Sequence, residues 1–213
     1  FLIRQELVHP DPVFQPRLYK VRSFSAACAG IGLGNLSMYT LLISVPLLLT
    51  SRDGSSALES GLVLAALSVA MIVLSPAGGA LADRHGRRVP AVIGLALVAI
   101  GAAPISVSGG GITLAPLLAG LALIGLGIGL STPGLQTSAV EAVPAAQAGS
   151  ASGLYATSRY FGSITGSALL ASFLTSDAPN PEGIGAVFTI VLISAILATV
   201  AALFLRPFPP SLK

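Results

Sequence analysis

The chain has 213 residues, of which 54% are hydrophobic and 9% charged, and its formal net charge is +3. A soluble domain carries roughly 25% charged residues, so this composition excludes an ordinary soluble protein and indicates a lipid environment. The small net charge gives no basis for nucleic-acid binding. A single cysteine and two histidines exclude a disulfide framework and supply no metal-binding cluster, so we expect no metal and no cofactor.

Residues 1–22 are polar, basic and rich in proline, and we predict that they form a cytoplasmic linker or tail. The chain begins with Phe1 rather than Met and shows no signal peptide, so we expect a segment of a longer protein.

Six apolar runs follow, each long enough to cross a bilayer, which takes about 20 residues. They predict a bundle over residues 23–205, with spans at about 24–49, 61–81, 89–107, 112–133, 150–174 and 184–205. Residues 138–147 are expected to form a loop or a short surface helix. We expect residues 206–213 to form a second cytoplasmic tail, because the prolines in this segment prevent the last helix from continuing. The predicted fold is an all-α membrane protein of six transmembrane helices, arranged as two three-helix repeats.

Basic residues gather on one side of the predicted bundle. Both tails and the loop between the second and third spans carry nine of them, whereas the opposite loops carry only Arg52. The positive-inside rule therefore places both ends of this segment in the cytoplasm. We expect a multi-pass protein of the cell (inner or plasma) membrane.

The loop between the second and third spans has the sequence Gly79-x-x-x-Asp83-Arg84-x-Gly86-Arg87-Arg88. Gly86 permits the positive φ that a tight turn between helices needs. Asp83 can meet a helix N-terminus, where unpaired N–H groups and the helix dipole favour an anion. A plain basic turn is the alternative, but such a turn needs neither Asp83 nor Gly86 at these spacings.

This loop resembles the short cytoplasmic loop between the second and third spans of each half of the major facilitator superfamily transporters. The resemblance covers nearly the whole chain, as the last six spans of a longer protein. Weaker patterns around Val143-Pro144 and Gly149 are similar to the fourteen-span drug:proton antiporter branch. The resemblance implies a cytoplasmic latch in which Asp83 docks on a helix end of the other half. The latch residues are Gly79, Asp83, Arg84, Gly86, Arg87 and Arg88.

Two predicted spans are interrupted by glycine and proline, the first from Gly30 to Pro46 and the fourth from Gly120 to Gly134. Paired interruptions in repeated halves point to a transporter's binding cavity. Alternatively, the glycines permit close helix packing in lipid, and this is the interpretation that we favour for most of them. Asn35 and Tyr39 lie one turn apart on one helix face, where they either line a wet cavity or bridge two helices.

The fifth span carries small and polar residues at steps of three and four, which places them on one helix face. We expect helix packing at Gly149, Gly153, Gly162 and Gly166, and cavity lining by Tyr155 and Arg159. A charge at the bilayer centre costs about 2.5–3.5 kcal/mol on insertion scales. Arg159 therefore either reaches toward the cytoplasmic face or faces the bundle, where it binds backbone carbonyls or an anionic group.

No Asp, Glu or His lies within the six predicted spans. Proton-coupled antiport needs a titratable group near the cavity, and the resemblance implies that this group belongs to a missing N-terminal half. An apolar surface with hydroxyls and amides suits a small lipophilic solute, including lipophilic cations. Together with the sequence, the resemblance thus implies the C-terminal half of a secondary transporter that exports lipophilic molecules or drugs in exchange for protons by alternating access. Its expected partners are the lipid bilayer, the missing half and the solute.

Two other functions fit the sequence less well. One is a membrane scaffold that transports nothing. The other is an intramembrane enzyme with Ser150 or Ser152 as nucleophile, which needs a general base within reach. The two histidines, His9 and His85, lie in predicted cytoplasmic segments, so we expect no enzymatic activity and no catalytic residue.

Overall fold

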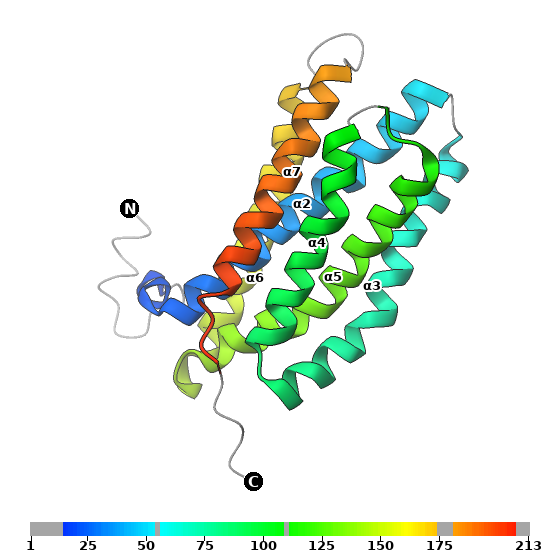
Figure 1. Cartoon of the computed structure of the whole chain (residues 1–213). Coiled ribbons are helices and arrows are strands. Elements are labelled where there is room, and N and C mark those ends of the chain that lie inside the picture. Colours follow the sequence, from blue (N-terminus) through cyan, green and yellow to red (C-terminus); the bar gives the residue numbers. More distant parts are fainter. Residues whose placement is uncertain (1–14, 54–55, 109–110, 174–180, 208–213) are drawn as a thin grey trace.

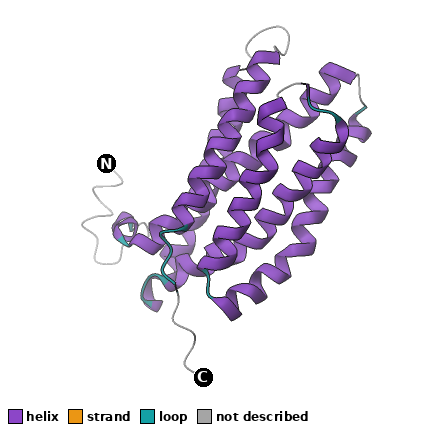
Figure 2. Ribbon diagram, in the orientation of Figure 1, coloured by secondary structure: helices purple, strands orange, loops and turns teal. Residues whose placement is uncertain are grey.

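The computed structural model describes residues 15–53, 56–108, 111–173 and 181–207, and these residues are helical apart from short turns (Figures 1 and 2). The elements are η1 (Pro16–Lys20), α2 (Arg22–Asp53), α3 (Ala57–His85), α4 (Arg88–Ser108), α5 (Leu114–Glu141), η3 (Ala145–Gln147), α6 (Ala148–Phe173) and α7 (Pro181–Ala202).

The long helices run alternately up and down in one bundle (Figure 1). The start of α2, the α3–α4 turn, the α5–α6 connection and the end of α7 all lie at the same end of it. Two helices make the most extensive contacts: α2 packs against α6 and α7, and α5 packs against α3 and α4. Helices α4 and α7 also pack against each other, and α2 touches α5.

Two clusters of buried apolar side chains form the core, one toward each end of the bundle. One surrounds Leu41, Ile105 and Phe188, and the other surrounds Phe24 and Leu135. Helices α2, α4, α5 and α7 supply most of both clusters, whereas α3 and α6 contribute few residues. Helices α3 and α6 therefore lie at the margin of the core.

Within the described residues, five helices are long and apolar enough to cross a membrane, namely α2, α3, α4, α5 and α7. Helix α6 is 26 residues long but contains many serine, threonine and glycine residues. Its hydroxyls donate to carbonyls one turn earlier, as Thr157 does to Gly153 at 2.9 Å and Ser158 to Leu154 at 2.9 Å. These bonds satisfy the hydroxyls inside the helix, which lowers the cost of placing them in an apolar environment.

Local sequence explains where α3 begins and where it ends. Ser56 and Glu59 form a capping box at its start, in which the Ser56 N–H donates to the Glu59 carboxylate at 2.7 Å. At its other end Gly86 has a φ of 84°, in the left-handed region that favours glycine. The tight turn predicted at Gly86 is therefore present, and α4 begins two residues later.

Helices α2 and α5 differ from the sequence prediction, in addition to α6, which was predicted as a span but is not among the five described helices apolar enough to cross a membrane. Helices α2 and α5 are continuous through the expected interruptions, with Pro46 and Pro133 inside them. Helix α5 also continues to Glu141, so residues 138–141, expected in a loop or short surface helix, belong to a long helix.

Close packing between helices explains several of the glycines at the expected interruptions. A Cβ at Gly101 would lie 2.6 Å from the Gly120 carbonyl oxygen, and a Cβ at Gly120 would lie 2.7 Å from that of Gly101. The two glycines thus let the α4 and α5 backbones touch, as small residues do between helices in lipid.

Candidate functional site

A cavity of about 690 Å³ lies among α2, α3, α5 and α6. Its two flanking helices are the marginal ones, α3 packed on α5 and α6 packed on α2. The residues that line it are Ile31, Asn35, Met38, Tyr39, Met71, Ile72, Ser75, Pro76, Ile128, Gly129, Thr132, Arg159, Tyr160 and Ser163. Three of the four residues predicted to line a cavity, Asn35, Tyr39 and Arg159, are thus brought together.

Most of the polar lining is hydrogen-bonded within its own helix. The Asn35 amide donates to the Ile31 carbonyl at 3.0 Å, and the Thr132 hydroxyl donates to the Ile128 carbonyl at 2.7 Å. The Ser163 hydroxyl donates to the Arg159 carbonyl at 3.1 Å. These bonds hold the side chains along the cavity wall. The remaining surface is largely apolar with a few polar groups, which is typical of sites for small organic molecules.

Arg159 is half-buried and carries the formal charge of this cavity lining. One of its terminal N–H groups donates to the Tyr160 hydroxyl at 3.2 Å, and its guanidinium carbon lies 5.0 Å from the centroid of the Tyr160 ring. This contact is a cation–π arrangement. It holds the guanidinium beside the cavity.

Tyr155 does not line this cavity, contrary to the expectation from the sequence. Its side chain is 4% exposed and belongs to the core cluster around Phe24. Four residues advance a helix by about 6 Å and turn its face by about 40°, which takes Tyr155 away from the cavity beside Arg159. In the described structure its buried hydroxyl has no hydrogen-bond partner.

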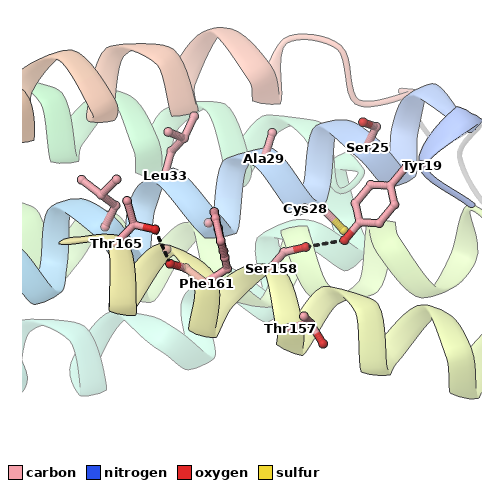
Figure 3. A pocket seen from close by; sticks show the side chains of 12 residues that line it. Tyr19, Ser25, Cys28, Ala29, Leu33, Thr157, Ser158, Phe161 and Thr165 are labelled. Atoms are coloured by element: carbon pink, nitrogen blue, oxygen red, sulfur yellow. Dashed lines mark hydrogen bonds between the residues drawn. The ribbon is translucent and has the colours of Figure 1, made fainter. Parts of the chain in front are cut away.

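A second cavity, of about 610 Å³, lies between η1, α2 and α6 (Figure 3). The Tyr19 and Ser158 hydroxyls are hydrogen-bonded at 2.8 Å across it, and the buried Cys28 lies beside them. Its lining contains no charged side chain. No sequence pattern indicated this cavity, because the contact across it joins residues 139 positions apart. We take the Arg159 cavity as the candidate site, since it combines apolar walls with a charge.

The loop between α3 and α4 holds a cluster of charges around Arg87. Arg87 donates to both Glu141 carboxylate oxygens, at 3.2 and 2.9 Å, and to Asp83 at 2.8 Å. The hydrogen bonds to Glu141 are the main cause of a raised pKa of Arg87. The Arg87 side chain is 16% exposed, whereas that of Asp83 is 76% exposed. Arg87 therefore ties the loop to the end of α5, and Asp83 remains accessible.

Glu141 is a residue of this cluster that the sequence analysis missed. Only its position in the sequence could have indicated this role. Residues 138–147 connect two predicted spans at the end of the bundle where the charged loop also lies. Of the other loop residues, Arg84 is exposed and Arg88 half-buried. A Cβ at Gly79 would meet no atom within 4 Å, whereas one at Gly78 would lie 2.6 Å from the Leu130 carbonyl oxygen. It is Gly78 that lets α3 approach α5.

The four glycines expected to pack on α6 fall into two pairs. A Cβ at Gly162 would collide with the Gly32 carbonyl oxygen, and one at Gly166 would lie 2.7 Å from that of Leu36. These two glycines let α6 touch α2. A Cβ at Gly149 or Gly153 would meet no atom within 4 Å, so these two make no close helix contact in the described structure.

Comparison with known proteins gives a consistent family. The Major Facilitator Superfamily matches residues 25–213. An uncharacterized MFS-type transporter of Bacillus subtilis, YvkA, is 30% identical over 167 residues, covering 78% of this chain and 38% of that protein. The multidrug resistance protein Stp of Mycobacterium tuberculosis is 32% identical over 166 residues, covering 78% and 31%. The multidrug efflux pump LfrA of Mycolicibacterium smegmatis is 27% identical over 193 residues, covering 86% and 38%.

The chain therefore spans only 31–38% of the length of these three relatives. The family match covers all of the described long helices apart from the first residues of α2. This chain belongs to the Major Facilitator Superfamily of membrane transporters.

Proposed function

We propose that the chain is the C-terminal six-span half of a secondary transporter that exports lipophilic small molecules in exchange for protons, by alternating access. The observation that carries the proposal is the cavity of about 690 Å³ among four helices, with apolar walls and with Asn35, Tyr39 and Arg159 on its surface. Relatives named as multidrug proteins support a lipophilic solute.

The helix contacts support two three-helix repeats, α2–α4 and α5–α7. The first helix of each triplet packs on the second and third helices of the other, since α2 packs on α6 and α7 while α5 packs on α3 and α4. In this arrangement α6 takes the place that α3 has in the other triplet. We therefore assign α6 as the sixth span, with its hydroxyls satisfied inside the helix.

The remaining wall of the cavity is assigned to an N-terminal half. Apolar side chains on both flanking helices are largely exposed, among them Ile72 and Val73 on α3 at 67% each and Phe161 on α6 at 70%. An opposing helical half would cover these faces and would supply the carboxylate that proton coupling needs. We place both ends of this segment in the cytoplasm, with the charged loop as a latch that contacts the other half through Asp83.

The experiment that tests this function blocks the cavity in the complete natural protein. In a Cys28→Ala background, Ser75→Cys places a thiol on the cavity wall, and Ser68→Cys places one two turns away on the same helix, outside the lining. Reaction with a bulky thiol reagent should abolish most export of a fluorescent lipophilic dye by the Ser75→Cys protein. The Ser68→Cys protein should keep its export.

Mass spectrometry confirms that both thiols have reacted. Unchanged export by a fully modified Ser75→Cys protein would show that this cavity is not on the solute's path. Absence of export of every lipophilic dye by the unmodified protein would instead favour a scaffold that transports nothing.

A further inference from the structure

We propose that the cavity binds anionic lipophilic solutes, such as aryl carboxylates, and that Arg159 is the residue that binds the anion. This inference rests on the proposed function and names the class of its solute. It differs from the expectation of lipophilic cations that the apolar and amide-bearing surface alone suggested.

The charges near the cavity have one sign. Arg159 is the formally charged side chain among the lining residues. Among carboxylates whose side chains the structure describes, Glu59 lies in the capping box at the start of α3, and Asp83 and Glu141 are bound to Arg87. None of these three carboxylates lines the cavity. A cation that enters would meet a like charge in a weakly screened environment, and an anion would meet an opposite one.

The geometry of Arg159 leaves its guanidinium able to bind an anion. A guanidinium presents five N–H donors in a planar fork that matches a carboxylate at two points. In the described structure one of these donors bonds to the Tyr160 hydroxyl, while the Tyr160 ring lies against the guanidinium. The remaining donors have no acceptor among the described side chains that line the cavity. The ring holds the guanidinium in place, and its remaining N–H groups can donate to a carboxylate.

The position of Arg159, far from the start of α6, also favours a lipophilic anion as the ligand. Arg159 is the twelfth residue of α6, about 17 Å from the start of the helix at 1.5 Å per residue. A charge near the middle of a bilayer is costly unless it is paired or hydrated. Met71, Ile72 and Ile128 on the opposite walls can hold an aromatic ring while the guanidinium binds its carboxylate. A lipophilic anion fits both surfaces at once.

The test compares three compounds that share one ring system and differ in charge: 2-naphthoate, 2-naphthamide and 2-naphthylmethylammonium. Equilibrium dialysis measures their binding to the complete natural protein in a neutral detergent. We expect 2-naphthoate to bind at least about tenfold more tightly than the ammonium compound, which is the equivalent of one hydrogen bond to a charged group. Arg159→Gln should remove this preference, and Arg159→Lys should retain part of it. Arg17→Gln is the matched control, because it removes an exposed arginine from η1, outside the cavity.

Equal binding of the three compounds would overturn the inference, and so would a preference for 2-naphthoate that persists in the Arg159→Gln protein. Failure of the unmodified protein to bind 2-naphthoate would also overturn it. If dye export is intact in any of these cases, the proposed function stands and only the charge preference fails. If dye export is absent as well, the proposed function fails with it.

Discussion

Arg87 binds two carboxylates that differ in their exposure. Glu141 lies at the end of α5 with its side chain 33% exposed and receives two hydrogen bonds, whereas Asp83 is 76% exposed and receives one. Bidentate pairs between arginine and carboxylate are among the stronger polar contacts in proteins, and exposed pairs contribute little to stability. At the scale of single residues, Glu141 should therefore act mainly on the fold. Asp83 is the residue whose side chain, exposed and held by one hydrogen bond from Arg87, can reach another surface.

The first residue-scale prediction separates these two roles. In the complete protein, Asp83→Asn should leave the thermal unfolding temperature and abundance nearly unchanged while greatly reducing dye export, because it removes a charge that the proposed latch needs in one conformation only. Glu141→Gln should lower the stability by up to about 1 kcal/mol, the upper end of the range for an ion pair at the protein surface. Thermal melting in detergent and dye export measure the two effects. Normal export by an abundant Asp83→Asn protein would contradict the latch.

At the scale of elements, the contact between α2 and α6 depends on the absence of side chains at two positions. Gly162 and Gly166 lie against the carbonyl oxygens of Gly32 and Leu36, so the two helices meet backbone to backbone. This contact fixes α6, and with it the position of Arg159, relative to the wall that α2 provides. Gly153 is exposed on the same helix and would accept a side chain without a clash.

The element-scale prediction compares Gly162→Val with Gly153→Val. Both changes alter intrinsic helix preference equally, so the difference between them measures packing. Gly162→Val should lower stability by about 1–3 kcal/mol more than Gly153→Val, which is the usual range for an overpacked contact. Thermal melting of the two purified proteins at equal detergent concentration gives the comparison. Equal melting temperatures would mean that α2 and α6 are not in close contact.

At the scale of the whole molecule, the parts that the sequence predicts well are those set by local pattern. The apolar runs located the helices, and the spacing of Asn35 and Tyr39 placed them on one face because helical spacing depends on neighbouring residues alone. The bond between Arg87 and Glu141 joins residues 54 positions apart, and the Tyr19–Ser158 contact joins residues 139 apart. Such contacts depend on which helices are neighbours, a property that no single helix contains. Tyr155 was misplaced for this reason, since the core cluster around Phe24 covers the part of the helix on which it lies.

The last prediction concerns the 213 residues expressed alone, which should insert into membranes but should not transport. Insertion is expected because the apolar runs and the bias of basic residues to one side need no partner, and α2, α3, α4, α5 and α7 are each long and apolar enough to cross a membrane. Transport should fail because the cavity lies between the marginal helices α3 and α6 and lacks a carboxylate among its lining residues.

The measurement is dye uptake and efflux in vesicles that contain the chain alone, followed by vesicles in which the proposed N-terminal half is co-expressed as a separate chain. Cross-linking monitors self-association, because the exposed apolar faces that include Ile72 and Phe161 would favour a homodimer in which one copy covers the other. Restoration of transport by the separate half would support the assignment of that half as the opposite wall of the cavity. Proton-coupled transport by the 213 residues alone would refute it, because the coupling group and the second wall would then have to come from this chain.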